Sequence, residues 1–356
     1  MSWIAKLARG GRAPALITPR ERISFAALAR LARARRRELE RAGIGPEQAV
    51  LLALPNSPEL VIDLLALRDL HAVPVLAPRG LGAAAVQVGR RAAGAAWIRD
   101  PRGLRRSGAA RSARLEGIAL VKISSGSTGA PKAIALSDRQ LECDGAQVRR
   151  GLRLGAADRI LITVPLLHSY GFDFGFLQLL RGSALILAPP LPRAIGAALD
   201  AGATVFPAIP FVLDLLSRHA RDLRAPRLRA VISAAAPLEP EVAARAAAVL
   251  GRPIRPHYGS SEAGALTLGR RQRWAGDVGA AFPGVRLGLR GGRVEAGGGQ
   301  VALGYLSAGR LAQRFGGRFL SQDRGRLDRG GLTLLGRADR VRVLPSGSKQ
   351  KSLLRE

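Results

Sequence analysis

The chain has 356 residues, 47% of them hydrophobic, which is enough apolar material for one large core or two. Its formal charge of +30 comes from 56 lysine and arginine residues against 26 acidic ones. All but five of the basic residues are arginine, they are spread along the whole chain, and aromatic residues make up only 4%. This pattern favours the composition of a GC-rich genome over a nucleic-acid-binding surface, and it leaves an acidic carrier protein or an anionic lipid surface open as a second use of the charge.

Cysteine and hydropathy exclude several other classes of protein. The single cysteine, Cys143, rules out a disulfide within the chain, and four scattered histidines argue against a histidine-based metal centre. The first ten residues lack an apolar stretch long enough for a signal peptide. The most apolar region, residues 49–67, contains two prolines and two carboxylates, which do not suit a bilayer-spanning helix. We therefore expect a cytoplasmic protein with no transmembrane segment.

The first third of the chain predicts alternating helices and strands. In order, it predicts an amphipathic helix at residues 23–43, a buried strand at 50–54, a helix at 55–67 and a strand at 72–76. Residues 79–117 are rich in Ala, Arg and Gly with weak periodicity, so they predict only a helix and a linker. The alternation is typical of a layered α/β domain.

A Ser/Thr/Gly-rich loop at residues 124–132 lies between two apolar runs and predicts strand, loop, strand. It offers four hydroxyls, two glycines that let backbone N–H groups approach a ligand, and the ammonium group of Lys132, all of which suit a polyphosphate. Lysine is rare in this chain, so its presence at 132 indicates a need for a compact cation. Ala130-Pro131 and the strand that follows exclude a Walker-type loop. A flexible Ser/Gly hairpin loop is the alternative.

The nine residues from Ser124 to Lys132 resemble the phosphate loop of the adenylate-forming (AMP-binding) superfamily, which includes acyl- and aryl-CoA synthetases, peptide-synthetase adenylation domains and luciferases. The resemblance implies an α/β fold, layered α-β-α-β-α, with two β-sheets flanked by helices and a small β-barrel subdomain. It also implies that Lys132 is a catalytic residue that binds ATP, and that Thr128 helps to hold Mg²⁺. The remaining nucleotide contacts that it implies in this loop are Ser125, Gly126, Ser127, Thr128 and Gly129.

The region after the loop predicts a helix at residues 138–149 and a strand at 160–164. The strand leads into Pro165-Leu-Leu-His-Ser-Tyr-Gly171, which resembles the acyl-pocket motif of acyl-CoA, aryl-CoA and acyl-carrier-protein synthetases. By this resemblance His168, Tyr170 and Gly171 bind the carboxylic acid substrate. The apolar segments at 203–207 and 209–211 would form walls of an apolar pocket. A histidine that only caps a helix is the alternative reading of His168.

A predicted strand at residues 229–233 ends at Ala234-Ala-Ala-Pro237. The superfamily usually has Gly-Gly-Ala-Pro at this turn, where the backbone holds adenine. The resemblance therefore implies nucleotide contacts at Ala235, Ala236 and Pro237. Because alanines replace both glycines, the site stays small, but the backbone path of the turn becomes an open question.

A helix to residue 250 and a strand then lead to Tyr258-Gly-Ser-Ser-Glu262, the second match to the superfamily. An aromatic ring can lie against adenine, a hydroxyl can reach the α-phosphate, and a carboxylate can hold Mg²⁺ between phosphate oxygens. The resemblance implies nucleotide contacts at Tyr258, Gly259, Ser260 and Ser261. It makes Glu262 both a catalytic residue and a metal ligand. A turn with Ser and Glu at a helix N-terminus is the alternative.

The last part of the chain predicts a subdomain, a ribose contact and a short tail. Residues 276–305 are Gly-rich and alternating, which suits the small β-barrel. Residues 319–339 resemble the superfamily's ribose-binding segment, so Asp323 and Arg337 would contact the ribose and Asp339 would act as the hinge. We expect a core domain at 1–339 and a tail at 340–356 in place of the superfamily's mobile lid domain. The tail resembles the end of that lid, which makes Lys349 a candidate catalytic residue; a low-complexity basic tail is the alternative.

Together these resemblances imply an AMP-forming ligase that uses ATP and Mg²⁺. It would activate an acyl or aryl carboxylic acid, as in fatty acid metabolism, and pass the acyl group to the thiol of CoA or of an acyl carrier protein. The rival hypothesis is a pseudoenzyme that binds AMP or an acyl group and acts as a sensor or scaffold. The sequence does not distinguish acyl from aryl substrates.

Overall fold

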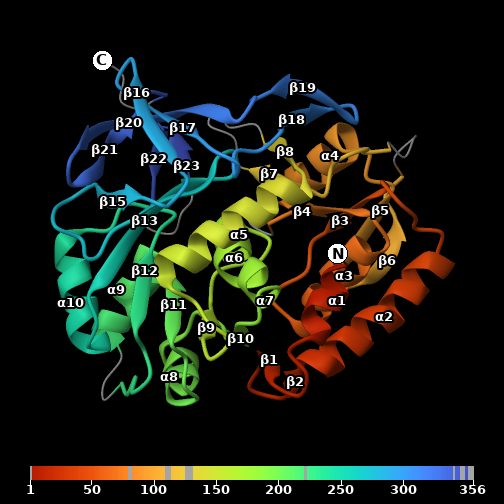
Figure 1. The fold of residues 1–356 in the computed structure, drawn as a ribbon, viewed down its shortest axis with the longest axis horizontal. Coiled ribbons are helices and arrows are strands. Elements are labelled where there is room, and N and C mark those ends of the chain that lie inside the picture. The colour runs from red at the N-terminus through yellow and green to blue at the C-terminus, as the bar shows by residue number, and fades with distance from the viewer. Residues whose placement is uncertain are drawn as a thin grey trace.

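The computed structural model describes residues 2–78, 82–108, 114–124, 131–219, 223–339, 341–344 and 349–351 (Figure 1). Two large β-sheets organise these residues, one of thirteen strands and one of eight. The predictions for Ser125, Gly126, Ser127, Thr128 and Gly129 fall outside the described residues.

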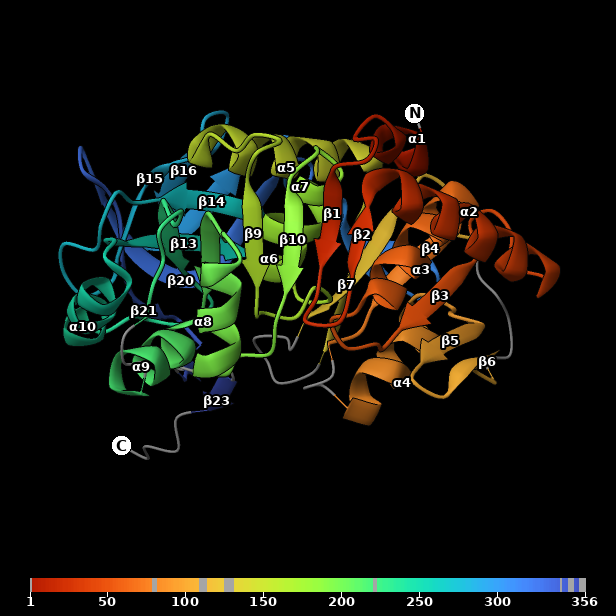
Figure 2. The ribbon, with the colours of Figure 1, turned by 90° about the horizontal axis from the view of Figure 1, so that it is seen from below.

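Half of the thirteen-stranded sheet is parallel. Figure 2 shows three of its parallel strands, β9, β10 and β1, side by side. Strands β10, β11 and β12 are buried at every residue, which explains why their sequences are short apolar runs rather than alternations. The strands of this half, in spatial order, are β13 (Ile254–Ser260), β12 (Ala230–Ser233), β11 (Val205–Ala208), β9 (Arg159–Ile162), β10 (Ala184–Leu187), β1 (Pro14–Ile17) and, antiparallel at the edge, β2 (Arg22–Ser24).

The other half of this sheet is antiparallel and forms the subdomain predicted after residue 264. Its strands continue from β13 in the order β14 (Gly264–Leu268), β15 (Asp277–Ala281), β21 (Gly331–Arg337), β20 (Arg318–Asp328), β17 (Arg293–Gly297) and β16 (Arg286–Arg290). Leu266, Val278, Val294 and Leu332 form its small apolar core. Among the described residues, β16 is an edge strand and does not pair with β13. The subdomain is therefore an extension of the large sheet.

The eight-stranded sheet carries the phosphate-loop strands. Its order is β19 (Arg310–Arg314), β18 (Gly304–Ser307), β8 (Lys132–Leu136), β7 (Leu120–Ser124), β4 (Val73–Leu76), β3 (Ala49–Leu52), β5 (Trp97–Asp100) and β6 (Gly103–Arg106). Strands β7 and β8 pair antiparallel with Ser124 opposite Lys132, as the strand, loop, strand prediction requires. The prediction that residues up to 305 belong to the subdomain was wrong at its end, because β18 pairs with β8 instead.

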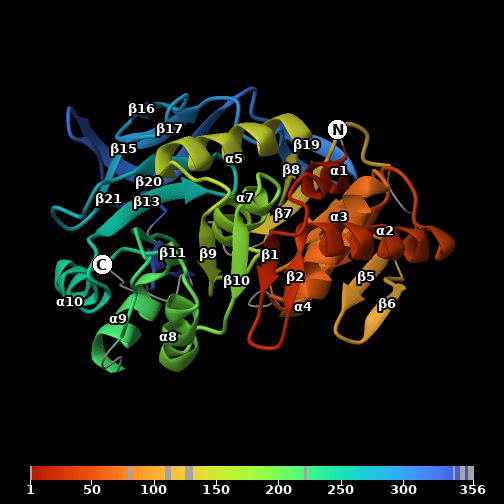
Figure 3. The same cartoon turned by 60° about the horizontal axis from the view of Figure 1, so that its bottom comes forward.

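Helices fill three layers around the two sheets. Figure 1 shows α5 crossing the middle of the molecule, and Figure 3 shows α8, α9 and α10 grouped on one side. Between the sheets lie α1 (Trp3–Ala8), α2 (Phe25–Arg41), α3 (Pro58–Asp69), α5 (Asp138–Leu152), α6 (Ser169–Gly171), the π-helix η2 (Phe172–Phe176) and α7 (Leu177–Leu179). The outer layers are α8 (Pro192–Asp200), α9 (Pro210–His219) and α10 (Pro240–Leu250) on the larger sheet and α4 (Gly82–Ala92) on the smaller. The α-β-α-β-α prediction is confirmed.

Local sequence explains where the helices begin, and it also explains one omission. Ser24 and Ser57 cap α2 and α3 by accepting the backbone N–H groups of Ala27 and Leu60. The region at 79–117 contains the strands β5 and β6 besides the predicted helix α4. These strands were missed because each has only four residues and arginines interrupt their apolar pattern.

Two further features are the pairing of the last two strands and the lengths and hydropathy of the helices. Strands β22 (Val341–Val343) and β23 (Lys349–Lys351) pair antiparallel, with residue 343 opposite residue 349, so these parts of the tail form a hairpin. None of the helices in the described part of the chain is both long enough and apolar enough to cross a membrane.

A buried charged cluster includes a residue of β7, the strand that precedes the phosphate loop in the sequence. Lys122, on β7, is 2% exposed, and its Nζ lies 2.8 Å from Oδ1 of Asp173 on η2. Asp144 on α5 is completely buried beside them and accepts the backbone N–H of Ala265. Burial, together with the neighbouring Asp144 carboxylate, raises the pKa of Asp173 well above its usual range. The cluster therefore joins three elements: β7, η2 and α5.

Replacing Lys122 with Met should destabilise the fold by about 3–5 kcal/mol at pH 8, because it leaves buried carboxylates without their cation. The loss should shrink toward pH 5, since protonation then neutralises those carboxylates. Urea denaturation at both pH values measures the free energy of unfolding. Arg218→Ala is the control: it breaks the exposed Arg218–Asp214 pair and should cost less than about 1 kcal/mol. Equal losses in the two variants would show that the buried pair has no special role.

Candidate functional site

A cavity of about 2560 Å³ opens where the carboxyl ends of parallel strands from both sheets meet the antiparallel subdomain. In open α/β sheets, ligands bind at this edge of the strands. The cavity brings together most of the residues that the sequence singled out: Lys132, His168, Tyr170, Ala235, Ala236, Pro237, Tyr258, Gly259, Ser260, Ser261, Glu262, Asp323 and Arg337. Residues separated by up to about two hundred positions in the sequence therefore face one space.

Two of the predicted site residues are placed differently. Gly171 does not line the cavity; a Cβ on it would lie 2.2 Å from the carbonyl oxygen of Pro165, so glycine allows α6 to pack against the preceding loop. Lys349 is described only through the backbone of β23, so its catalytic role stays a prediction.

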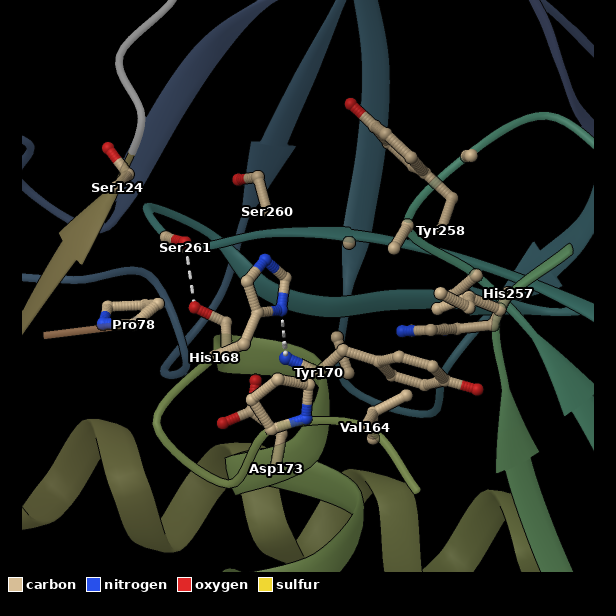
Figure 4. A pocket seen from close by; sticks show the side chains of 18 of the residues that line it. Pro78, Ser124, Val164, His168, Tyr170, Asp173, His257, Tyr258, Ser260 and Ser261 are labelled. Carbon is tan, nitrogen blue, oxygen red and sulfur yellow. Dashed lines mark hydrogen bonds between the residues drawn. The ribbon is translucent and has the colours of Figure 1, made fainter. Parts of the chain in front are cut away.

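His168 is the N-terminal capping residue of α6 and also lines the cavity. Its Nδ1 accepts the backbone N–H of Tyr170 at 3.3 Å, so the capping role considered as an alternative is present together with the cavity position. Tyr170 is buried and its hydroxyl donates to the carbonyl of Ile232 at 3.1 Å. Ser169 donates a 2.7 Å hydrogen bond to Ser261, which links the acyl-pocket motif to the motif at 258–262 (Figure 4).

Asn56 is a positioning residue that the sequence did not reveal. Its Nδ2 donates to the carbonyl of Val164, and its Oδ1 accepts the backbone N–H of Leu166, both at 2.8 Å. These two bonds fasten the loop that carries His168 to the start of α3. No local pattern could show this role, because the partners of Asn56 lie more than a hundred residues away in the sequence.

The turn at Ala234–Pro237 keeps a glycine-like backbone without glycine. Ala235 has a φ of +74°, in the left-handed region that residues with a Cβ rarely adopt. Such a conformation costs on the order of 1 kcal/mol, so the surrounding structure imposes it. The open question about the backbone path is therefore answered: the path has a positive φ at the position of the second glycine.

Tyr258, Asp323, Arg337 and Asp339 form one hydrogen-bonded chain at the subdomain side of the cavity. The hydroxyl of buried Tyr258 donates to Oδ2 of Asp323 at 2.7 Å, and Nη1 of Arg337 donates to Oδ1 at 2.8 Å. Arg337 also forms a two-point contact with Asp339, at 2.9 and 2.7 Å. Both oxygens of Asp323 are thus oriented before any ligand binds. A ribose hydroxyl would use their remaining lone pairs.

Lys132 and Glu262 meet at Tyr305, a residue that the sequence analysis did not single out. Nζ of Lys132 lies 4.6 Å from the centroid of the Tyr305 ring, and the Tyr305 hydroxyl donates to Oε1 of Glu262 at 3.0 Å. Within the described residues, no group of three or more His, Cys, Asp or Glu side chains is placed to hold a metal ion. A magnesium ion that keeps phosphate and water ligands needs only one or two carboxylates, so Glu262 fits a role toward Mg·ATP.

His257 lines the cavity behind Tyr170 as a neutral side chain. Its Nδ1 lies 2.6 Å from the carbonyl oxygen of Thr267, and because a carbonyl only accepts, Nδ1 carries the proton. Burial lowers the pKa of His257 to about 4 from 6.5. The imidazole also stacks on Tyr170, with ring centroids 5.7 Å apart. His257 is thus an uncharged part of the cavity wall at neutral pH.

The free energy of unfolding should fall by up to about 3 kcal/mol as the pH drops from 6.5 to about 4 on account of His257. In this range the unfolded chain binds a proton at this histidine and the folded chain does not, so stability rises with pH. Urea denaturation across the range measures the slope. His257→Phe should flatten the slope, whereas replacement of the exposed His219 with Ala should leave it unchanged. An unaltered slope in His257→Phe would contradict the buried, neutral state.

Comparisons with known proteins show the family and the fold of the chain. The family model for AMP-binding enzymes matches residues 4–99 and 93–305. The oxalate–CoA ligase of Arabidopsis thaliana is 28% identical over 153 residues, which are 41% of this chain and 30% of that protein. The 2-succinylbenzoate–CoA ligase of Salmonella typhimurium is 30% identical over 225 residues, which are 62% of this chain and 47% of that protein. The match thus spans less than half the length of each relative.

Solved structures share the fold at low sequence identity. O-succinylbenzoate CoA synthetase from Bacillus subtilis, in complex with AMP, superposes with a TM-score of 0.83 at 17% identity, covering 96% of this chain and 79% of that one. The N-terminal domain of FACL13 from Mycobacterium tuberculosis gives 0.82 at 21% identity, covering 94% of this chain and 99% of that domain. The family match extends over well more than half of the sequence and over most of the cavity-lining residues. The chain therefore belongs to the AMP-binding enzyme family.

Proposed function

We propose that the protein is an AMP-forming ligase that activates a carboxylic acid with ATP for transfer to a thiol. The observation that carries this proposal is the convergence of Lys132, Glu262 and Asp323 on one cavity from three separate parts of the chain. A cation, a carboxylate suited to a phosphate-bound metal ion and a ribose-binding carboxylate are the groups that Mg·ATP requires. Membership of the AMP-binding family supports the same choice of nucleotide.

In the proposed reaction, a carboxylate oxygen of the acid forms a bond to the α-phosphorus of ATP, and the bond from that phosphorus to the bridging oxygen of pyrophosphate breaks. The products are an acyl-adenylate and pyrophosphate. Lys132 would neutralise negative charge on the phosphates, and Glu262 would help to hold a phosphate-bound Mg²⁺, which would supply further charge neutralisation. Tyr258 and the turn at Ala235 form walls for the base, while Asp323 and Arg337 fix the ribose. The protein's main contribution is thus positioning and charge neutralisation.

The acid would enter between α6 and the carboxyl end of the large sheet. Val164, Leu167, Ile209 and Phe211 line this part of the cavity with apolar surface, and His168 lies beside them. Such a lining suits an acyl chain or an aromatic ring rather than a fully polar acid. We propose CoA as the thiol acceptor, because the relatives above are named as CoA ligases, with an acyl carrier protein as the second candidate.

With a panel of carboxylic acids, ATP labelled in the α-phosphate should yield labelled AMP. In a separate assay, labelled pyrophosphate should exchange into ATP only when a suitable acid is present. Lys132→Ala and Glu262→Gln should each lower the exchange rate about a hundredfold, since the loss of one such charged contact costs roughly 3 kcal/mol. The exposed variant Arg218→Ala should keep the parent rate. Formation of ADP would overturn the proposal, and ATP binding without exchange on any acid would favour the pseudoenzyme.

We further propose that a lysine of the tail hairpin reaches the phosphates, since β23 includes Lys349 and Lys351. The double variant Lys349→Ala/Lys351→Ala should then lose about tenfold to a hundredfold in the adenylation rate while it keeps its ATP affinity within a few-fold. Pyrophosphate release measures the rate, and calorimetry measures the affinity. Unchanged adenylation would remove the tail from the mechanism and leave it as a basic appendage.

A further inference from the structure

Tyr305 lies between the Lys132 ammonium group and the Glu262 carboxylate in the cavity. Its ring lies under the Lys132 ammonium group at 4.6 Å, and its hydroxyl lies 3.0 Å from Oε1 of Glu262. All three side chains are partly buried and line the same cavity. No ion pair involves either Lys132 or Glu262 within the part of the chain that the structure describes. One neutral side chain thus stabilises both charges, and the two charged groups do not form an ion pair with each other.

The backbone explains why Tyr305 lies there. Strand β18 pairs antiparallel with β8, the strand that begins at Lys132, and places Tyr305 opposite Ile134. Just before β18, the backbone N–H of Ala302 donates to the carbonyl of Glu262 at 2.9 Å, and that of Leu303 donates to the carbonyl of Ala135 at 2.9 Å. Backbone hydrogen bonds therefore connect residues 302–306 both to Glu262 and to β8.

The chemistry of tyrosine suits this position. Its hydroxyl is the donor in the 3.0 Å contact with Oε1, because an ionised carboxylate can only accept. A donor on one carboxylate oxygen fixes the orientation of the other, as outer hydrogen bonds do for metal-binding carboxylates. The electron-rich face of the ring attracts the ammonium group without neutralising it. No hydrogen bond within the described residues reaches Oε2 of Glu262, so that oxygen stays available to a ligand.

We propose that Tyr305 is a positioning residue that orients Glu262 toward phosphate-bound Mg²⁺ and keeps Lys132 from pairing with Glu262. This inference rests on the proposed function for its ligand, Mg·ATP. It extends that function, because it assigns a role to a residue outside the matched motifs. Its two halves are separable: the hydroxyl acts on Glu262, and the ring acts on Lys132.

Calorimetric titration of ATP, once with Mg²⁺ and once with EDTA, tests the hydroxyl without requiring turnover. Tyr305→Phe keeps the ring and should weaken ATP binding roughly tenfold or more in Mg²⁺ while it leaves binding in EDTA unchanged. A purely structural role would weaken both to the same extent. The control Ser183→Ala removes a buried hydroxyl outside the cavity, which donates to the carbonyl of Gly155, and should match the parent protein in both titrations.

Tyr305→Leu tests the ring. It removes the surface under the ammonium group as well as the hydroxyl, so it should weaken ATP binding in EDTA too, by a few-fold relative to Tyr305→Phe. Where the acid panel identifies a substrate, Tyr305→Phe should raise the Mg²⁺ concentration needed for half-maximal exchange, with a smaller effect on the rate at saturating Mg²⁺.

The outcomes for this inference and for the proposed function are distinguishable. Equal Mg²⁺-dependent binding in the parent and in Tyr305→Phe would overturn the role of Tyr305, whether or not the protein makes AMP. Suppose that none of the acids supports pyrophosphate exchange but Tyr305→Phe selectively loses Mg²⁺-dependent ATP binding. This result would support the role of Tyr305 and contradict the ligase proposal.

Discussion

Burial of the central strands on both faces, as in β3, β4, β11 and β12, is the constraint on which the site depends. A strand covered on two sides favours apolar side chains along its length, and a charged one such as Lys122 needs a buried partner, so most polar groups gather where the strands end. The two sheets sandwich one layer of helices, and the carboxyl ends of β9, β11 and β12 from one sheet face the same cavity as the end of β7 from the other. The cavity is thus a consequence of the layering. The antiparallel subdomain then closes its third side with Asp323 and Arg337.

The large positive charge has a structural use that does not involve a ligand. The outermost strand at each end of the two large sheets exposes arginines: Arg22 on β2, Arg286 and Arg290 on β16, Arg105 and Arg106 on β6, and Arg310 and Arg314 on β19. Unpaired sheet edges invite pairing with other chains, and charged side chains on them prevent it. An arginine on an edge strand can also cover aromatic surface: the guanidinium carbon of Arg106 lies 4.0 Å from the centroid of the Trp97 ring. Charge spread over sheet edges agrees better with this role than with one continuous docking surface.

Much of the architecture could be predicted from the sequence because local signals were strong. The apolar runs of β3, β4 and β12, the serine caps of α2 and α3, and the loop between β7 and β8 each depend on neighbouring residues alone. The contacts that were missed are long-range. Asn56 bonds to residues 108 and 110 positions away, and the pairing of β18 with β8 spans about 170 positions. No local pattern predicts such partners, and β18 looked like one more strand of a Gly-rich subdomain.

Residue rarity would have located Tyr305, by the same argument that located Lys132. The chain has only three tyrosines, Tyr170, Tyr258 and Tyr305, and all three line the cavity. Each also has a hydrogen-bonded hydroxyl: Tyr170 donates to a strand carbonyl, whereas Tyr258 and Tyr305 donate to the carboxylates of Asp323 and Glu262. A partly buried carboxylate near an anionic nucleotide needs a partner that orients it without cancelling its charge, and a neutral phenol does this where an arginine would not. In a chain so rich in arginine, a tyrosine beside Glu262 therefore has a physical reason: it would leave the negative charge of Glu262 available to the metal ion proposed above.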